Sequence, residues 1–283
     1  MKTKNTILWV LAFLITIAFA VYQRTTGPTY PMKGNGALGG SVIEYKLDRS
    51  HGGDDDSRVS IKIPDGSIEG VLYYKRYKTD DAWTMVHMNY DGDELVAYLP
   101  HQPPAGKLQY HIKLNRGNSE VRLPKYTDVV MRFKGNVPLW ILIPHILLMF
   151  TAMLLSTRTG LQALLTTDKL KSLSFYTIII LFFGGLIFGP IVQKFAFGEY
   201  WTGIPFGIDL TDNKTLIAFI GWLIALIAVY KGKSPRLFVI GASVLTLLIF
   251  MIPHSALGSE LDYSTGNIKQ AGYFLKHISW LKV

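Results

Sequence analysis

Five apolar segments and one long polar block alternate along this chain of 283 residues. The four segments after the polar block contain no Asp, Glu, Lys or Arg: Leu139–Ser156, Phe175–Val192, Leu216–Tyr230 and Leu237–Ile252. Each is close to the roughly 20 residues of helix that cross about 30 Å of hydrocarbon. The pattern predicts a membrane α-helical bundle with four transmembrane helices in residues 137–254, preceded by an N-terminal signal or anchor helix.

The N-terminal segment, residues 1–23, allows two interpretations. A short basic stretch precedes the apolar run Ile7–Val21, and Ala18-Phe19-Ala20 has the small-x-small form of a signal-peptidase site. The apolar run continues through Tyr22, a residue suited to the membrane interface, which favours an uncleaved anchor. Under either interpretation, the polar block that follows is exported.

Basic residues in the short connectors predict the orientation. They are Lys2 and Lys4, then Arg158, Lys169 and Lys171, then Lys231, Lys233 and Arg236. Short loops rich in Lys and Arg stay in the cytoplasm. We therefore expect a multi-pass protein of a bacterial inner (cytoplasmic) membrane. Its polar block, its loop 194–213 and its C-terminal tail 255–283 would be extracytoplasmic.

The polar block, residues 41–134, predicts an all-β domain. Short strands with alternating apolar positions, such as Val59–Ile63 and Leu108–Leu114, recur at regular spacing. Asp65-Gly66 and Asp91-Gly92 read as hairpin turns. The order of strands and aromatic residues resembles immunoglobulin- or fibronectin-like modules, which implies a β-sandwich. Residues 24–40, rich in Gly and Pro, are expected to form a linker.

Composition narrows the classes of function. The formal charge is +9, but the basic residues are spread over loops and strands without an arginine-rich run. We therefore expect contact with the lipid bilayer and not with nucleic acid. The chain has no cysteine. Disulfides, zinc–thiolate sites, iron–sulfur clusters and covalent c-type haem are thus excluded within it.

Two histidines predict a cofactor site at the outer leaflet. The tripeptide Ile-Pro-His occurs twice, ending at His145 and at His254. Met149 lies one helical turn after His145, and Met251 precedes His254 by three residues. His and Met together suit copper or the axial positions of haem b. The alternative is that the histidines hydrogen-bond neighbouring helices and that the methionines fill space.

The outward loop could close this site. It contains Glu199, Trp201 and Asp209, and we expect Asp212-Asn213 to cap the next helix. With the placement of the two histidines, Gly198, Trp201 and Asp209 resemble the haem-handling proteins of cytochrome c maturation. The resemblance implies haem binding, although a second tryptophan is missing and the spacing differs.

Three hypotheses of function follow. The first is a non-enzymatic envelope protein that binds other membrane or periplasmic proteins, because no nucleophile–base pair or phosphate loop is present. The second is a haem- or copper-handling protein that uses His145 and His254, with Glu199, Trp201 and Asp209 lining the site. The third is an enzyme acting on lipid or a lipid-linked sugar at the outer leaflet, with Glu199, Asp209 and Asp212 as general acid and base.

Overall fold

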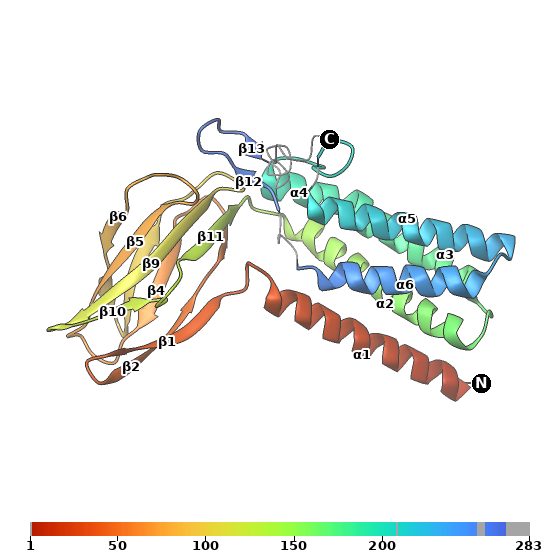
Figure 1. Ribbon diagram of the computed structural model, residues 1–283, viewed down its shortest axis with the longest axis horizontal. Helices are drawn as coiled ribbons and strands as arrows, with labels where there is room; N and C mark the ends of the chain where they lie inside the picture. The colour runs from red at the N-terminus through yellow and green to blue at the C-terminus, as the bar shows by residue number, and fades with distance from the viewer. Residues whose placement is uncertain (1, 208, 254–257, 270–283) are drawn as a thin grey trace, which may run out of the picture. The chain divides into compact units, whose positions relative to one another are not determined.

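Contacts divide the chain into two compact units. The computed structural model describes residues 2–207, 209–253 and 258–269. The helical unit contains the described residues up to Pro28 and from Val137 to Ser259 (Figure 1). The β unit contains Thr29–Asn136 and Glu260–Lys269.

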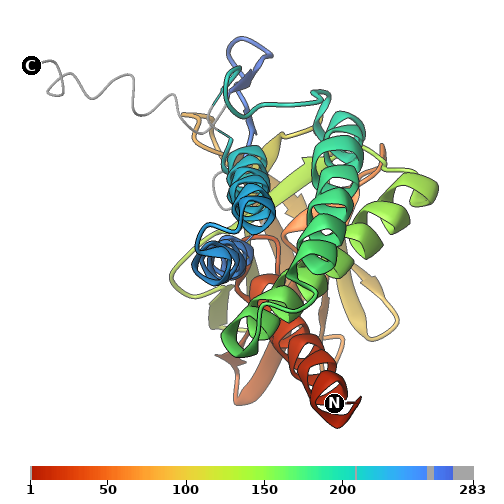
Figure 2. The ribbon, with the colours of Figure 1, turned by 90° about the vertical axis from the view of Figure 1, so that its right-hand side faces the viewer.

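The helical unit has six α-helices within the described ranges. They are α1 (Lys2–Thr26), α2 (Leu139–Leu165), α3 (Leu170–Leu181), α4 (Gly189–Phe197), α5 (Leu210–Lys231) and α6 (Pro235–Met251). The π-helix η1 (Phe182–Phe188) joins α3 to α4, so that the three form one rod (Figure 2).

Four helical stretches in this part of the chain are long and apolar enough to cross a membrane. They are Thr3–Thr26, Leu139–Leu165, Leu170–Phe197 and Leu210–Lys231. Helix α6 is also apolar but has only 17 residues. The prediction of apolar helices suited to a membrane is therefore confirmed. The fifth apolar segment forms a helix shorter than these four.

Small residues bring the helices into close contact. A Cβ on Gly185 in η1 would lie 2.5 Å from Cγ2 of Thr215 in α5. A Cβ on Gly184 would lie 2.9 Å from Cβ of Leu148 in α2. Helices in a membrane associate through such close packing, because lipid tails are as apolar as the side chains and the hydrophobic effect does not drive the helices together. The glycines of η1 therefore pack against α2 and α5 inside the chain.

Two arginines join helix ends in the helical unit. Arg236 donates to the carbonyls of Ala163 (2.8 Å) and Leu164 (2.6 Å), so the α2–α3 and α5–α6 connectors share one end. Arg158 donates to Asn5 Oδ1 (2.7 Å), which places the start of α1 near the same end. Arg158 itself was predicted in the α2–α3 connector. That prediction is wrong, because helix α2 continues through it to Leu165 and buries it.

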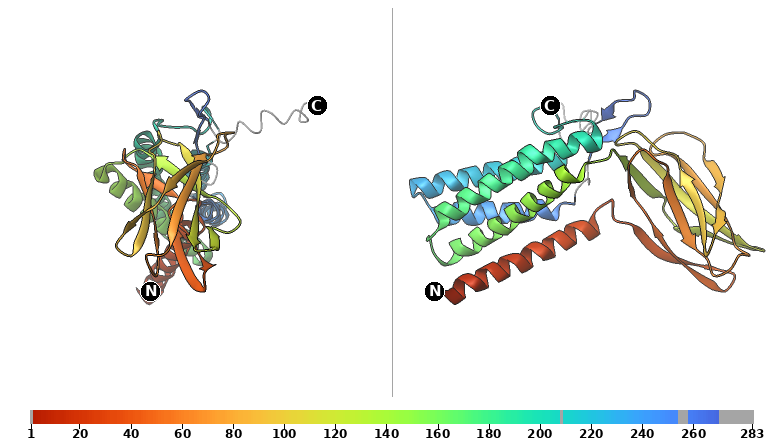
Figure 3. Two further views of the ribbon diagram at one scale, coloured as in Figure 1. Left: turned by 90° about the vertical axis from the view of Figure 1, so that its left-hand side faces the viewer. Right: turned by 180° about the vertical axis from the view of Figure 1, so that it is seen from behind.

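The strands of the β unit form two main sheets and two hairpins. One sheet has the order β3 (Ser50–Gly52), β11 (Val129–Lys134), β9 (Lys107–Arg116), β5 (Glu69–Arg76) and β6 (Thr84–His87), with β10 (Ser119–Leu123) also paired to β9. The other has the order β4 (Ser57–Lys62), β8 (Glu94–Leu99) and β7 (Asn89–Asp91). The hairpins are β1 (Met32–Leu38) with β2 (Ser41–Leu47), and β12 (Glu260–Leu261) with β13 (Ile268–Lys269) (Figure 3).

One apolar core holds these sheets together. Alternate residues of β4 and β8, such as Ile61 and Leu99, join Leu72 of β5 and Ile112 of β9 in a single buried cluster. The opposite residues of each strand face outward, as alternation requires. The prediction of an all-β domain from alternating short strands is confirmed.

Residues 24–40 were predicted to form a linker, but most of them lie in regular structure. Helix α1 continues to Thr26, and strand β1 pairs along its whole length with β2. The glycines of β1 serve close packing and not flexibility. A Cβ on Gly36 would lie 2.5 Å from Cδ2 of Leu123, so the missing side chain lets β1 lie against β10. A Gly-rich sequence satisfies both a linker and such a strand.

Of the two predicted hairpin turns, one is confirmed and the other is wrong. Asp91-Gly92 does turn β7 into β8, with Gly92 at φ +64°. Asp65-Gly66 instead connects β4 to β5, which lie in different sheets. Asp65 Oδ1 accepts from the backbone N of Ser67 (2.9 Å), and Oδ2 pairs with Arg116 (2.8 Å). The carboxylate therefore organises a crossover loop.

The predicted extracytoplasmic tail, residues 255–283, is described only in part. Its described part from 260 to 269 forms the β12–β13 hairpin of the β unit, where Leu261 N donates to Ala105 O (3.1 Å). The remaining tail, from 270 onward, lies outside the described residues.

Candidate functional sites

His145, the first predicted cofactor ligand, contacts the π-helix. Its Nδ1 lies 2.9 Å from the carbonyl oxygen of Gly184, which also accepts from Gly189 N in the wide π-turn. π-Turns are frequent at functional positions because they displace backbone groups from the regular ladder. The second predicted ligand, His254, lies outside the described residues. The structure therefore gives no geometry for the pair.

The other predicted ligands are dispersed. Met149 is near His145, since a Cβ on Gly184 would lie 3.1 Å from its Sδ. Met251 is 37% exposed at the end of α6, and Glu199 is exposed. Trp201 Nε1 donates to Ile204 O (3.0 Å) within its own loop. No group of three or more His, Cys, Asp or Glu that could hold a metal ion occurs in the described part of the chain.

The loop between α4 and α5 uses its acids to fold. Asp209 is the N-cap of α5, where Oδ1 accepts from Thr211 N (2.8 Å) and Asp212 N (3.4 Å). Asp212 Oδ2 accepts from Thr202 N (2.6 Å). The prediction of a cap at Asp212-Asn213 was wrong because helix α5 begins earlier, at Leu210. Asp209 and Asp212 thus act as backbone acceptors, which explains their burial.

Gly203 completes this loop. A Cβ at Gly203 would lie 2.7 Å from Cβ of Asp212 and 2.8 Å from Oδ1 of Asn213. Asn213 Oδ1 accepts from Ile204 N (2.7 Å). The combination of glycines and acids that suggested a ligand-closing loop therefore has a structural explanation in these hydrogen bonds.

The sequence analysis did not predict the burial of two cations, Arg158 and Lys214. Arg158, 2% exposed, donates to Asn5 and to Gln162 Oε1 (2.8 Å), and its guanidinium lies 5.4 Å from the ring centre of Trp9. Lys214, 4% exposed, donates to the carbonyl oxygen of Ile252 (2.9 Å). Both lie just outside an apolar run, so the sequence pattern gives no reason to expect them inside a helix. Knowing where α2 ends and where α5 begins would have placed them within these helices.

A row of side chains on the six-stranded sheet forms a second candidate site. Met85, Tyr73 and His111 lie directly opposite one another on β6, β5 and β9. Their neighbours Leu72 and Ile112 are in the core, so this row is on the outer face. We call Tyr73, Trp83, Met85, His111, Arg122 and Asp128 the outer sheet face.

Aromatic rings cover His111 on this face. Tyr73 stacks on its imidazole with ring centroids 5.1 Å apart, and Trp83 meets it edge-on at 4.8 Å. His111 is therefore only 8% exposed, whereas Met85 is 64% exposed and Trp83 37%. The result is an aromatic surface with an exposed methionine at its side.

Charged groups fix the other side of His111. Its Nδ1 lies 3.0 Å from Asp128 Oδ1, and Arg122 also binds that carboxylate. Burial lowers the pKa of His111, and the charge of Arg122 lowers it further, which outweighs the opposite effect of Asp128. His111 is therefore neutral near pH 7, and the charge of Asp128 is matched by Arg122.

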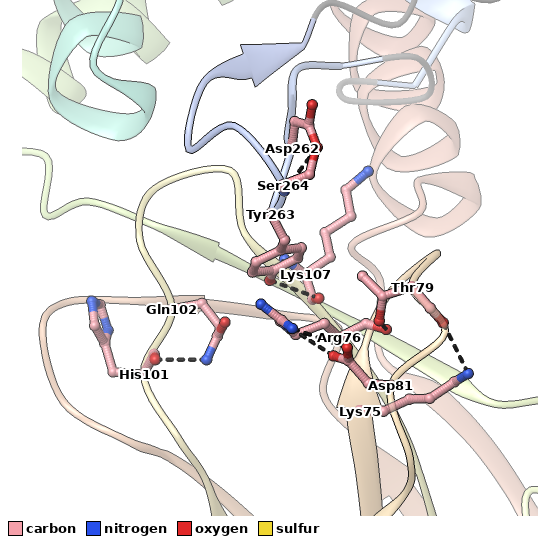
Figure 4. A network of polar contacts seen from close by, with 10 residues as sticks. All are labelled: Lys75, Arg76, Thr79, Asp81, His101, Gln102, Lys107, Asp262, Tyr263 and Ser264. Atoms are coloured by element: carbon pink, nitrogen blue, oxygen red, sulfur yellow. Dashed lines mark hydrogen bonds and ion pairs between the residues drawn. The ribbon is translucent and has the colours of Figure 1, made fainter.

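A polar network fastens the β12–β13 hairpin to the β unit (Figure 4). Tyr263 Oη accepts from Lys107 N (2.8 Å) and donates to Lys107 O (2.9 Å). Burial raises the pKa of Tyr263 to about 12. Arg76 lies 5.1 Å from the Tyr263 ring and pairs with Asp81, whose pKa falls to about 2 through that hydrogen bond. The network is satisfied within the unit, which indicates a structural role.

Comparison with protein-family models, with curated proteins and with solved structures finds no match.

Proposed function

We propose that this chain is an integral envelope-membrane protein that binds a protein partner through the outer sheet face. The observation that carries the proposal is the exposed pair Trp83 and Met85 beside a buried, hydrogen-bonded His111. Aromatic residues, Met and Arg are enriched at protein interfaces, and the aromatic rings among them supply contact area at little cost in side-chain entropy. The proposed role is that of a non-enzymatic component or partner-binding subunit of a membrane complex.

The proposed orientation places the β unit outside the cytoplasm of a bacterial inner membrane. Arg236 and Arg158 support it, because their contacts put the connectors that carry Lys169 and Lys233 at the same end of the bundle as the start of α1. Basic connectors at one end favour retention of that end in the cytoplasm. We also propose α6 as a fifth crossing, since 17 residues span about 25 Å. A reporter fused at Gly203 tests the proposed orientation, and a cytosolic signal there would contradict it.

The N-terminal helix, in this proposal, is a retained anchor. Asn5 and Trp9 are the contacts of Arg158 on α1, and Gln23 Nε2 donates to Ile252 O (3.2 Å) at the other end. Cleavage after Ala20 would strip a buried arginine of an acceptor. Intact mass of the purified protein tests this point. A mature chain that begins after Ala20 would contradict it.

The immunoglobulin-like assignment of the β unit stays a proposal. Two sheets with a common core support a sandwich. The parallel pairing of β3 with β11 is the feature to compare in an experimental structure of this unit.

Site-specific photocrosslinking in native membranes tests the partner. A photoreactive residue at Met85 should yield an adduct of one defined mass, and Trp83→Ala should reduce it about 30-fold, as loss of a hot spot of roughly 2 kcal/mol implies. Tyr98 of β8, 53% exposed on the other sheet, is the matched control position, and Tyr98→Ala the matched variant. Equal adducts from both positions, or none from Met85, would contradict the proposal.

The second candidate function is haem or copper handling, favoured by the hydrogen bond of His145. Metal-binding histidines commonly use one ring nitrogen on a backbone carbonyl, which orients the other toward the metal. Nδ1 of His145 has such a contact with Gly184 O, and no described residue hydrogen-bonds Nε2. His145 fits one axial position. The test is an absorption spectrum with copper analysis of protein from haem- and copper-replete cells. Colourless, copper-free protein, or a signal unchanged in His145→Ala, would contradict this candidate.

A further inference from the structure

Strand β6 (Thr84–His87) ends its sheet with one edge unpaired. It follows β5 in the six-stranded sheet, and no described strand pairs with its other side (Figure 1). Met88 N donates to Gly70 O (2.8 Å), so the even-numbered residues of β6 are those that bond β5. In an antiparallel pair, the residues between these direct both backbone groups away from the partner strand. The backbone N–H and C=O of Met85 and His87 therefore point toward the open edge.

This edge lacks the features with which sheets block further pairing. Residues 82–90 contain no Asp, Glu, Lys, Arg or Pro. The other described edge strands of more than three residues each carry a charge, namely β1, β2, β4 and β10. Natural edge strands are protected by charges, proline, bulges or short length, because an open edge is a template for another strand. Strand β6 is thus available for strand pairing.

The side chains of β6 extend this opportunity to both faces of the sheet. Met85 is 64% exposed on the outer sheet face, and His87, two residues further on, is exposed on the same side. Val86 faces the other way and packs, partly buried, against the core. A strand added at this edge would therefore continue both the outer face and the core face.

A second copy of the same strand satisfies the edge completely. When two β6 strands pair antiparallel around a two-fold axis at Val86, Met85 of each lies opposite His87 of the other. Each such pair exchanges two hydrogen bonds, so all the outward backbone groups of these two residues are paired. The thioether of Met85 then lies beside the imidazole of His87, a favourable sulfur–aromatic contact. Because β6 carries no charge, no like charges face each other across the axis.

We propose that two copies of this chain pair through β6, so that their six-stranded sheets join into one. This inference rests on the proposed function and names its partner, since the second copy covers Met85 and brings the two outer sheet faces together. Two-fold dimers are the commonest closed assemblies, and such an interface uses the same surface of both copies. Backbone pairing supplies the affinity, and side chains at alternate positions supply the specificity.

Disulfide trapping in isolated membranes tests the pairing, because the chain has no cysteine of its own. In the proposed register the two Val86 Cα atoms are about 4.5 Å apart, a distance that a disulfide bridges. The two Thr84 Cα atoms are about 14 Å apart. Oxidation with copper phenanthroline should therefore join copies of Val86→Cys at least about tenfold faster than copies of Thr84→Cys. Thr84 is the more exposed residue, so random collision would favour it instead.

A backbone variant tests the hydrogen bonds themselves. His87→Pro removes the outward N–H but keeps the bonds of β6 to β5, which use its even-numbered residues. The dimer loses two hydrogen bonds, so its dissociation constant should rise about 30-fold. His87→Ala keeps the N–H, is the matched control and should stay within about fivefold of the wild type. Sedimentation in dodecyl maltoside measures this monomer–dimer equilibrium.

The outcomes separate this inference from the proposed function. Equal trapping of Val86→Cys and Thr84→Cys, or unchanged dimerisation of His87→Pro, would overturn self-pairing. The cysteine pair decides even if the proline variant misfolds. A photocrosslinked adduct at Met85 with a different protein, without a Val86→Cys disulfide, would overturn self-pairing and leave the proposed function standing. The absence of any adduct at Met85 would contradict both.

Discussion

The two units satisfy their basic side chains in different ways. In the β unit, Arg76 pairs with Asp81 and Arg116 with Asp65, so cations meet carboxylates. In the helical unit, Arg158, Lys214 and Arg236 donate instead to neutral oxygens. For Lys214 and Arg236 these are carbonyls at helix C-termini.

The surroundings explain this difference. A carboxylate in or near lipid carries a large desolvation cost, whereas the carbonyls at a helix C-terminus carry partial negative charge without any ionised group. The carbonyls of Ala163, Leu164 and Ile252 thus replace acids as partners for cations. The comparison indicates that Arg158, Lys214 and Arg236 of the helical unit depend on a few specific neutral acceptors, while Arg76 and Arg116 of the β unit are held by more exposed ion pairs.

The largest expected effect is on Arg158. Asn5→Leu removes the oxygen that accepts from Arg158 Nη2, which leaves a buried charged donor without that partner. We expect a loss of about 1.5–3 kcal/mol of unfolding free energy. Reversible unfolding in mixed detergent micelles measures it.

Two variants frame that result. Thr3→Leu, an exposed residue near the start of α1, is the matched control and should leave stability unchanged. Asp93→Asn removes the partner of Lys62, an exposed ion pair of the β unit, and should also have little effect, because exposed pairs contribute little. If Asp93→Asn proved as destabilising as Asn5→Leu, the distinction between the two units would fail.

The next test concerns a close helix contact inside the helical unit. Gly185→Ala places a Cβ 2.5 Å from Thr215 Cγ2 and should cost about 1–3 kcal/mol through overpacking between η1 and α5. Gly241→Ala in α6 meets nothing within 4 Å and is the matched control, expected to be neutral or slightly stabilising. Thermal unfolding of both variants in the same detergent makes the measurement. A neutral Gly185→Ala would show that η1 and α5 separate freely.

A smaller effect on stability is expected where Tyr263 fastens the β12–β13 hairpin to Lys107 of β9. Tyr263→Phe removes the hydroxyl that accepts from Lys107 N and donates to Lys107 O. The loss should be about 1 kcal/mol. Amide hydrogen exchange should accelerate at Lys107, while Tyr98→Phe on β8 should leave it unchanged. Unaltered protection of Lys107 would mean that the hairpin is not fastened through this hydroxyl.

The smallest effect is the pH dependence of the outer sheet face. The pKa of His111 is lowered in the folded state, so its neutral form is favoured there. Its contribution to stability is full above the ordinary pKa of about 6.5 and is lost as pH falls below it toward the folded value. Chemical unfolding followed by tryptophan fluorescence at pH 7.5 and 5.5 should show lower stability in acid. His111→Gln should reduce that difference, and an unchanged difference would assign it to other groups.

The spacing of apolar residues predicted the main strands well, because a strand with one buried face must place an apolar residue at every second position. Val59–Ile63 and Leu108–Leu114 alternate, and both lie in strands with one buried face. The apolar runs predicted helices, but they do not show where a helix ends, so Arg158 was placed in a connector that α2 in fact includes. Propensity likewise says little about β1, whose glycines are required by neighbours distant in sequence.

The candidate sites were less predictable. His145 was found because a histidine in an apolar run is conspicuous, whereas its contact with Gly184 depends on a π-turn that no local pattern encodes. Lys214 became notable only once α6 ended beside it. The outer sheet face depends on strand register, which brings Met85, Tyr73 and His111 together across three strands. A single sequence offers no signal for such register.

The carbonyl of Ile252 has a wider consequence. This one oxygen is the meeting point of α1, through Gln23, and α5, through Lys214, at the end of α6. A shift of that peptide group would slacken two helices at the same moment. Three helices thereby share one contact point, so a displacement of this peptide group would change the packing of α1, α5 and α6 together.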